Sequence, residues 1–160
     1  MREPTDSHAW IVPGRLAVAE RPGRGGRLHR RELRTAELRW WGAQGVATIV
    51  SGMRSRHCLD DYADMGFTVR WHPLRDPEQA RDAVWELARD VHGLLDGGTG
   101  AVLVHCDRAN EWLAAIDAVL RLELGLARTA RTALRQATAD GLPVGSLATS
   151  IVARPASAAA

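Results

Sequence analysis

Short apolar runs alternate with longer amphipathic segments along most of the chain, and this alternation constrains the fold more than any other feature of the sequence. The runs at 46–50, 67–71 and 101–104 have the length and composition of buried strands. Helical spacing, together with helix-ending glycines, predicts helices over 32–44, 59–65, 77–96, 113–124, 126–138 and 144–152. Strands that alternate with helices predict an α/β fold, with a central, mainly parallel sheet flanked by helices.

The remaining segments fit around one such sheet. Two apolar runs on either side of Pro13 and Gly14 predict a small hairpin at 10–19, and the glycine- and arginine-rich stretch 20–31 predicts a surface loop. At 160 residues the chain is long enough for one core, because folding at this length buries roughly 70% of the surface that the unfolded chain exposes. We therefore expect a single domain over 8–153, with flexible tails at 1–7 and 154–160.

Composition and charge exclude several function classes. The sequence is 46% hydrophobic and 25% charged, as in globular proteins, and its net charge of +2 is too small to indicate nucleic acid or a membrane as a partner. Every basic residue is arginine, a bias typical of GC-rich bacterial genes. Two cysteines do not make a disulfide scaffold, and no apolar stretch has the length of a signal peptide or a membrane span. The sequence therefore predicts a cytoplasmic protein.

The last strand leads into the segment HCDRANEW, which concentrates reactive and charged side chains. His105 and Cys106 stand at the carboxyl end of the strand, directly before a helix, and ligands of parallel sheets bind at that end. Loop amides and a helix N-terminus there form a cradle for an anion, and their field would lower the pKa of a thiol. The sequence therefore predicts a ligand-binding loop around Cys106, made of His105, Asp107, Arg108, Ala109, Asn110, Glu111 and Trp112.

In the order of its segments the chain resembles the cysteine-based protein tyrosine and dual-specificity phosphatases, whose signature is His-Cys, five residues, then Arg. The resemblance covers about Trp10 to Leu147. It includes the I-x-PG-x-L pattern at 11–16, ATIV at 47–50, VRWHPLRDP at 69–77, LVHC at 103–106 and LELGLARTARTALR at 122–135. It implies a dual-specificity phosphatase-like fold, with Cys106 as the nucleophile that forms a phosphocysteine and Asp76 as the general acid.

Three positions depart from the family pattern. Trp112 stands where the family has the arginine that binds two phosphate oxygens, Ala109 replaces a glycine, and Leu113 replaces a hydroxyl residue. Asp107 and Glu111 add carboxylates to the loop, and a unit charge at about 4 Å opposes an anion by about 4 kcal/mol. We therefore expect weak phosphate binding and a Cys106 thiol held near its protonated form. Trp112 either fills the would-be phosphate pocket or stacks on a ligand.

Several residues keep two roles open. Arg108 either replaces the missing arginine or pairs with Asp107 or Glu111, and Asp76 is either the retained acid or the cap of the helix expected from Pro77. The family resemblance implies that His105 binds its own loop rather than acting as a base.

Each cysteine follows a histidine, and the two pairs, 57–58 and 105–106, supply ligand types that zinc accepts. Neither pair has the spacing of a zinc site, so we expect no metal and no cofactor. Cys58 is a candidate disulfide partner of Cys106, because the loops that carry them should end at the same sheet edge. Some relatives of the superfamily use such a pair as a reversible redox lock.

These observations favour a pseudophosphatase, a binding or regulatory module that has kept the cysteine and lost phosphate recognition. Its partner would be an unidentified protein or small molecule. The alternatives are an active or weak cysteine-dependent phosphatase, in which Arg108 or an outside residue replaces the clamp, and a Cys106 enzyme or redox switch acting on a non-phosphate ligand.

Overall fold

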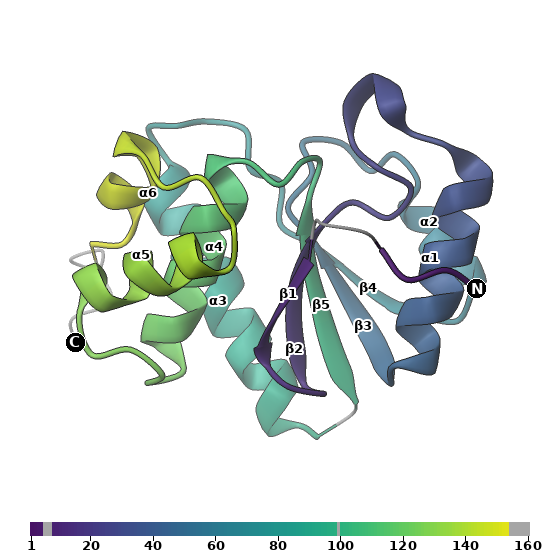
Figure 1. Cartoon of the computed structure of the whole chain (residues 1–160), viewed down its shortest axis with the longest axis horizontal. Coiled ribbons are helices and arrows are strands. Elements are labelled where there is room, and N and C mark those ends of the chain that lie inside the picture. Colours follow the sequence, from purple (N-terminus) through teal and green to yellow (C-terminus); the bar gives the residue numbers. More distant parts are fainter. Residues whose placement is uncertain (5–7, 99, 154–160) are drawn as a thin grey trace.

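The computed structural model of the chain describes residues 1–4, 8–98 and 100–153 (Figure 1). Its strands are β1 (His8–Val12), β2 (Leu16–Glu20), β3 (Val46–Ser51), β4 (Thr68–Trp71) and β5 (Ala101–Cys106). Its α-helices are α1 (Arg31–Ala43), α2 (Leu59–Asp64), α3 (Ala80–Asp96), α4 (Glu111–Glu123), α5 (Ala130–Ala139) and α6 (Ser146–Ile151), and a short 3-10 helix covers Gly26–Leu28.

The strands form one sheet in the order β1-β2-β5-β3-β4. β1 pairs antiparallel with β2 through the predicted hairpin, and β2, β5, β3 and β4 are parallel to one another. The mainly parallel α/β sheet predicted from the alternation is therefore confirmed. Its carboxyl-terminal edge gathers the loops that follow four strands, and this edge lies at the top of Figure 1.

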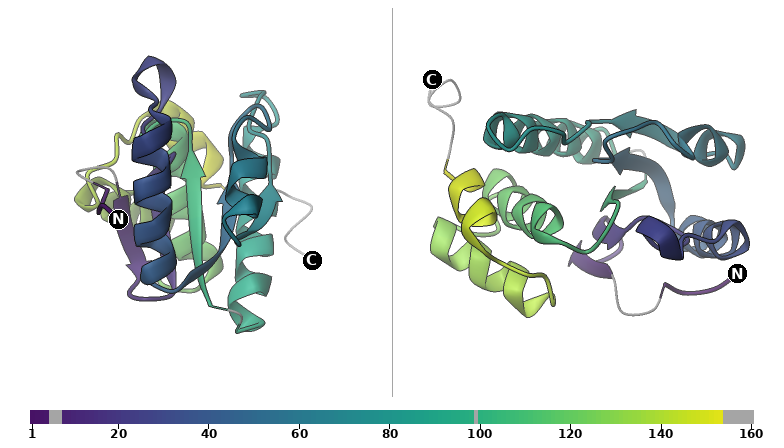
Figure 2. Two further views of the ribbon diagram at one scale, coloured as in Figure 1. Left: turned by 90° about the vertical axis from the view of Figure 1, so that its right-hand side faces the viewer. Right: turned by 90° about the horizontal axis from the view of Figure 1, so that it is seen from above.

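Helices cover both faces of the sheet (Figures 1 and 2). α1 and α2 lie against one face, and the group α3, α4, α5 and α6 lies on the other. The side chains of β5 alternate between the two layers: Val102, Val104 and Cys106 pack in the core with α3 and α4, whereas Ala101 and Leu103 pack in the core with α1 and α2. The alternation fixes which layer each residue at the end of β5 can reach.

Several element boundaries differ from the predictions by one to four residues, among them those of β5, α3 and α5. β5 continues through His105 and Cys106, because both remain paired with the neighbouring strands. α3 begins at Ala80 rather than at the preceding proline, and α5 begins at Ala130 rather than at 126. The late start of α5 follows from the end of α4. Gly125, with φ +71, ends α4, and the backbone N–H groups of 126 and 127 both donate to the carbonyl of Arg121.

The two ends of the chain are described in part. Of the expected tails, 5–7 and 154–160 lie outside the described residues. Residues 1–4 run beside α1, where the Arg2 N–H donates to the Ala36 carbonyl (3.1 Å) and Pro4 is buried. Among the helices described, none has the length and apolar character that crossing a membrane requires.

Candidate functional site

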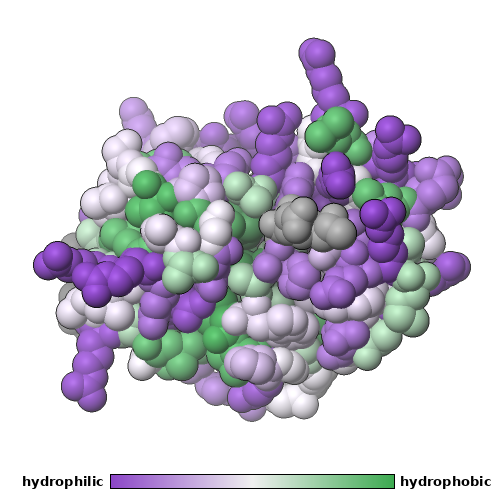
Figure 3. All heavy atoms as spheres, viewed as in Figure 1, coloured by the Kyte–Doolittle hydropathy of each residue, from purple (hydrophilic) through white to green (hydrophobic). Residues whose placement is uncertain are grey.

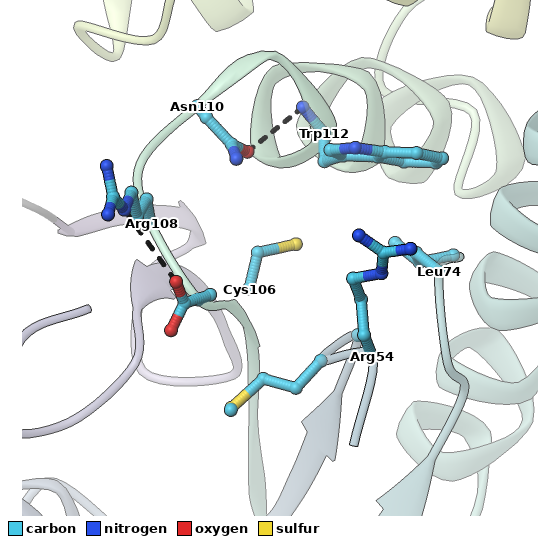
Figure 4. A pocket seen from close by; sticks show the side chains of 9 residues that line it. Arg54, Leu74, Cys106, Arg108, Asn110 and Trp112 are labelled. Atoms are coloured by element: carbon cyan, nitrogen blue, oxygen red, sulfur yellow. Dashed lines mark hydrogen bonds and ion pairs between the residues drawn. The ribbon is translucent and has the colours of Figure 1, made fainter. Parts of the chain in front are cut away.

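A cavity of about 420 Å³ opens at the carboxyl-terminal edge of the sheet, where the sequence predicts a ligand site (Figure 4). Three segments contribute to it: the loop after β3, the loop after β4, and the Cys106 loop, residues 106–112, which runs from the end of β5 into the start of α4. The lining residues are Gly52, Met53, Arg54, Leu74, Cys106, Asp107, Arg108, Asn110 and Trp112. We call this space the Cys106 cavity.

Cys106 ends β5 at the floor of this cavity. Its side chain is only 3% exposed, and the chain packs so closely there that a Cβ at Gly52 would lie 3.3 Å from the sulfur. Burial, and secondarily the negative charge of Asp107, raise the pKa of the Cys106 thiol to about 12. The thiol is therefore protonated at neutral pH, as expected from the carboxylates of the loop.

The two loop carboxylates do not both face the cavity. Glu111 turns toward α6, where its Oε1 accepts a hydrogen bond from the Ala148 N–H (3.1 Å), so the expectation that it opposes a bound anion is wrong. Asp107 borders the cavity, but its Oδ1 accepts from the Arg21 guanidinium (3.2 Å) and from the Gly26 N–H (3.3 Å). Asp107 is therefore paired with a cation of the protein at the edge of the cavity.

Arg108 does not occupy the position of a phosphate clamp. Figure 4 shows its side chain on the outer side of the Cys106 loop, pointing away from the thiol. Its Nε lies 3.7 Å from Asp107 Oδ2, and its guanidinium packs so tightly on the 21–30 loop that a Cβ at Gly26 would collide with it. Of the two roles left open by the sequence, the structure places Arg108 in the ion pair with Asp107.

Arg54 is the cavity residue that sequence reasoning missed. Its guanidinium and the Cys106 thiol point toward one another across the cavity, below the indole of Trp112 (Figure 4). The Arg54 backbone is held from the next loop, because its carbonyl accepts a hydrogen bond from Arg75 Nε (3.0 Å). The parallel-sheet rule places the loop after β3 at this edge, but it does not give the direction of a side chain.

Trp112 forms a wall of the cavity at the start of α4, as the sequence predicts for a residue facing the pocket. Its backbone N–H donates to the side-chain oxygen of the N-cap residue Asn110 (3.1 Å), so one amide of this helix N-terminus is already bonded. Ala109 fits the loop without strain, because the described non-glycine residues with positive φ are Arg24 and Cys58.

Asp76 lies outside the Cys106 cavity. It lines a neighbouring space of about 220 Å³, and Leu74 and Trp112 border both spaces. The Asp76 carboxylate accepts a hydrogen bond from the Glu78 N–H (2.9 Å), within the turn that precedes α3. The structure therefore gives Asp76 the capping role, although the capped turn comes before the helix itself, and does not bring its carboxylate to the thiol.

His105 is fully buried, and its ring lies on the opposite face of the sheet from the Cys106 side chain. Its Nδ1 lies 3.3 Å from the Cys106 carbonyl oxygen, so it binds its own loop, and its ring packs edge-on against Tyr62 with 5.6 Å between centroids. Burial lowers the pKa of His105 to about 4, which leaves the imidazole neutral. The observed contacts are those of a structural residue.

Cys58 is not brought together with Cys106. It packs with the core on the α1 and α2 side of the sheet, whereas Cys106 belongs to the core on the other side. Its sulfur accepts hydrogen bonds from Arg34 (2.8 Å) and Arg21 (3.4 Å), both buried. Across the described ranges, no three His, Cys, Asp or Glu side chains gather as a group that could hold a metal ion.

The fold and the position of the cavity define a class of structure: the protein has the fold of the protein tyrosine and dual-specificity phosphatases. No family model and no curated protein matches the sequence. Solved structures do match it. Tk-PTP in its active form is 18% identical, with a TM-score of 0.67, over 93% of this chain and 95% of that chain.

Two human structures share the fold as well. DUSP28 is 13% identical, with a TM-score of 0.67, over 95% of this chain and 94% of that chain. The tyrosine phosphatase-like serine/threonine/tyrosine-interacting protein is 14% identical, with a TM-score of 0.63, over 91% of this chain and 92% of that chain. At these identities the likeness defines the fold and leaves the chemistry to the site.

Proposed function

We propose that this protein is a pseudophosphatase, a module that binds a ligand or partner in the Cys106 cavity without hydrolysing phosphate. The observation that carries the proposal is the indole of Trp112, which forms a wall of the cavity at the start of α4, where the resemblance implies the phosphate-binding arginine. An indole offers one N–H donor and no charge, so it cannot hold two phosphate oxygens as a guanidinium does.

The state of the nucleophile supports the same proposal. Phosphocysteine chemistry needs the thiolate, which is the reactive form of cysteine. With a pKa of about 12, on the order of one Cys106 side chain in 10⁵ is ionised at pH 7. The carboxylate of Asp76, which would protonate the leaving group, is bonded to the Glu78 N–H outside the cavity. The three groups required by the phosphatase reaction are therefore absent, protonated or displaced.

The fold by itself is compatible with either activity. The structures that share it include a phosphatase described as the active form and a phosphatase-like interacting protein. The site therefore decides between them. Its apolar residues Leu74 and Trp112, together with Arg54, suit binding better than phosphoryl transfer.

Hydrolysis of an aryl phosphate such as p-nitrophenyl phosphate tests the proposal. We expect no turnover above that of Cys106→Ser, which removes the thiol and conserves its size. Turnover by the native protein that disappears in Cys106→Ser would contradict the proposal. Circular dichroism of both proteins provides the control for folding.

One observation favours a second candidate, a weak cysteine-dependent phosphatase. The Arg54 guanidinium points toward the thiol and is the side chain that could take over phosphate binding from the missing arginine (Figure 4). This candidate predicts weak turnover that is lost in Cys106→Ser and falls by at least tenfold in Arg54→Ala. The pseudophosphatase predicts that neither variant changes the rate.

A further inference from the structure

The loops at the carboxyl-terminal edge of the sheet carry most of the uncompensated positive charge of the molecule. They comprise residues 21–30, 52–58, 72–79 and 107–110, and we call them together the basic edge. They contain eight arginines and three carboxylates, a net charge of +5, whereas the whole chain has a net charge of +2. The rest of the molecule is therefore net negative, and the net charge of the whole chain does not reveal this asymmetry.

Seven of the eight arginines are exposed. They come from all four loops that surround the Cys106 cavity: Arg24, Arg27, Arg30, Arg54, Arg56, Arg75 and Arg108. Within the described parts of the chain, the pair of Arg108 with Asp107 is the one ion pair that involves any of them. Figure 3, in the view of Figure 1, shows hydrophilic side chains projecting at the upper right, where the 21–30 loop lies.

Two carboxylates near the 21–30 loop bond to its backbone, whereas Glu32, in the first turn of α1, is exposed. Glu20 accepts a hydrogen bond from the Gly25 N–H (2.9 Å), and the buried Glu37 accepts one from the Gly23 N–H (2.8 Å). They hold the loop in shape through its backbone. The exposed arginines of that loop therefore face solvent without an acidic partner from it.

The lining of the cavity at the centre of the basic edge is partly apolar, with Arg54, Asp107, Arg108 and Asn110 as its polar part. Trp112, Leu74 and Met53 line it, and its volume of about 420 Å³ is sufficient for one large side chain. Arg54 reaches into it, so an apolar group inside would lie beside a positive charge (Figure 4). A ligand that complements this surface has one apolar group for the cavity and several negative charges around it.

We infer that the basic edge docks an acidic segment of a partner protein, with one apolar side chain of that segment in the Cys106 cavity. This inference rests on the proposed function, because it requires that the cavity bind rather than hydrolyse. It identifies the partner by charge and by one anchor residue, with no requirement for a phosphate group.

The distribution of charge favours a peptide over a nucleic acid. Asp76 and Glu78 follow Arg75, the single arginine of the loop after β4, and a phosphate backbone with a charge on every nucleotide would meet them. A peptide can place its acidic residues opposite the arginines only. Single-stranded nucleic acids also use several stacking platforms. Here Trp112 lines the cavity, whereas the ring of Trp71 has the guanidiniums of Arg56 and Arg75 on it, each at 5.4 Å from the centroid.

Fluorescence anisotropy with a defined probe tests the inference. The probe is a fluorescein-labelled peptide with one leucine between two runs of four glutamates, and the matched probe has glycine in place of leucine. We expect the leucine probe to bind at least tenfold more tightly, because its side chain leaves water for the cavity. Binding should weaken as salt rises from about 20 to about 200 mM, because exposed charges are screened.

A charge-reversal pair locates the surface. Arg27→Glu with Arg54→Glu changes two loops on the basic edge and should weaken binding of the leucine probe at least tenfold. Arg131→Glu with Arg135→Glu makes the same change of charge on exposed positions of α5 and should leave binding within twofold of the native protein. Thermal unfolding of both variants shows whether either change acts through the fold.

Three results would overturn the inference: equal affinity for the leucine and glycine probes, an equal effect of the two charge-reversal pairs, or tighter binding of a single-stranded oligonucleotide with the same charge as the peptide. The aryl phosphate assay is independent of all three. Absence of both turnover and peptide binding would leave the proposed function standing and remove this inference, whereas Cys106-dependent turnover would remove the proposed function whatever the peptide result.

Discussion

Trp112 and Cys106 together define the chemistry open to this site. The indole forms the wall where a phosphate-binding arginine would be expected, and the thiol beneath it is buried and protonated. In the proposed pseudophosphatase the retained cysteine is a packing residue at the floor of the cavity, where a Cβ at Gly52 would lie 3.3 Å from its sulfur. Small buried cysteines commonly have this role.

Thiol labelling tests this account of the two cysteines. Iodoacetamide at pH 8 should alkylate the half-buried Cys58 in the folded protein, and should react with Cys106 about 10³-fold more slowly than with a free thiol, because almost no thiolate is present. Peptide mass spectrometry measures both sites. The variant Cys58→Ser should remain unlabelled until it is unfolded.

The same experiment after mild peroxide treatment examines the redox lock considered from the sequence. Because Cys58 and Cys106 pack on opposite sides of the sheet, we expect no disulfide between them. A native protein that forms this bond readily, or that labels at Cys106 first, would show that the loop around the thiol opens in solution.

At the scale of elements, the site depends on the contact between the 21–30 loop and the Cys106 loop. A Cβ at Gly25 would collide with the carbonyl oxygen of Asp107, and Arg21 joins the two loops through its pair with the same aspartate. The stretch predicted as a surface loop is therefore partly a support for the cavity. The 21–30 loop therefore combines exposed arginines with buried contacts that hold the Cys106 loop.

Substitution of glycine by alanine measures this contact. Gly25→Ala should destabilise the protein by about 1–3 kcal/mol, because the added methyl must displace the Cys106 loop. Gly93→Ala is the matched control: a Cβ at Gly93, inside α3, meets nothing within 4 Å, so this change should stabilise by about 0.5–1 kcal/mol. Urea denaturation measures both, and equal effects would mean that the two loops do not depend on each other.

A buried carboxylate between α4 and the end of α5 gives the fold a dependence on pH. Asp117 is fully buried, its Oδ1 accepts from Arg121 Nε (2.8 Å), and the same guanidinium binds Asp140 (2.6 Å). Burial, and secondarily its hydrogen bond with Asp140, raise the pKa of Asp117 to about 7. The folded state therefore holds this proton more tightly than the unfolded state, and the resulting stabilisation is lost as pH rises from about 4 to about 7.

Replacing the carboxylate by an amide tests this dependence. The free energy of unfolding of Asp117→Asn minus that of the native protein should increase by a few kcal/mol between pH 4 and pH 7, because only the native protein loses stability, and it should stay constant above pH 8. The comparison within a pair of proteins removes the contribution of other groups, such as His105, which titrate in both. A difference that does not change with pH would mean that Asp117 is ionised in the folded protein throughout.

At the scale of the whole molecule, the sequence was sufficient for the architecture and the place of the site. The alternation of apolar runs and amphipathic segments predicts the parallel sheet, and the end of a buried strand predicts the edge at which Cys106 lies. Both depend on patterns repeated over many residues. The starts of α3 and α5 were predicted three and four residues too early, because a turn before a helix has the same residue types as its first turn.

The directions of single side chains and the distribution of charge over the surface could not be predicted from sequence patterns. Glu111 binds a backbone amide of α6, a contact across 37 residues of sequence, and Arg54 enters the cavity from a loop with no motif of its own. The net charge of +2 argued against nucleic acid or a membrane as a partner, yet it is the sum of a positive edge and a negative remainder. Such properties depend on which loops the fold brings together, and they appear only with the tertiary structure.

Titration with orthovanadate, which mimics phosphate, tests most directly the proposal that Trp112 prevents this site from recognising phosphate. We predict no binding to the native protein, and binding that appears in Trp112→Arg combined with Ala109→Gly, because the arginine supplies the missing clamp and the glycine frees the loop. Isothermal calorimetry of the native protein, the double variant and its Cys106→Ser derivative provides the measurement. Vanadate binding to the native protein, lost in Cys106→Ser, would contradict the account.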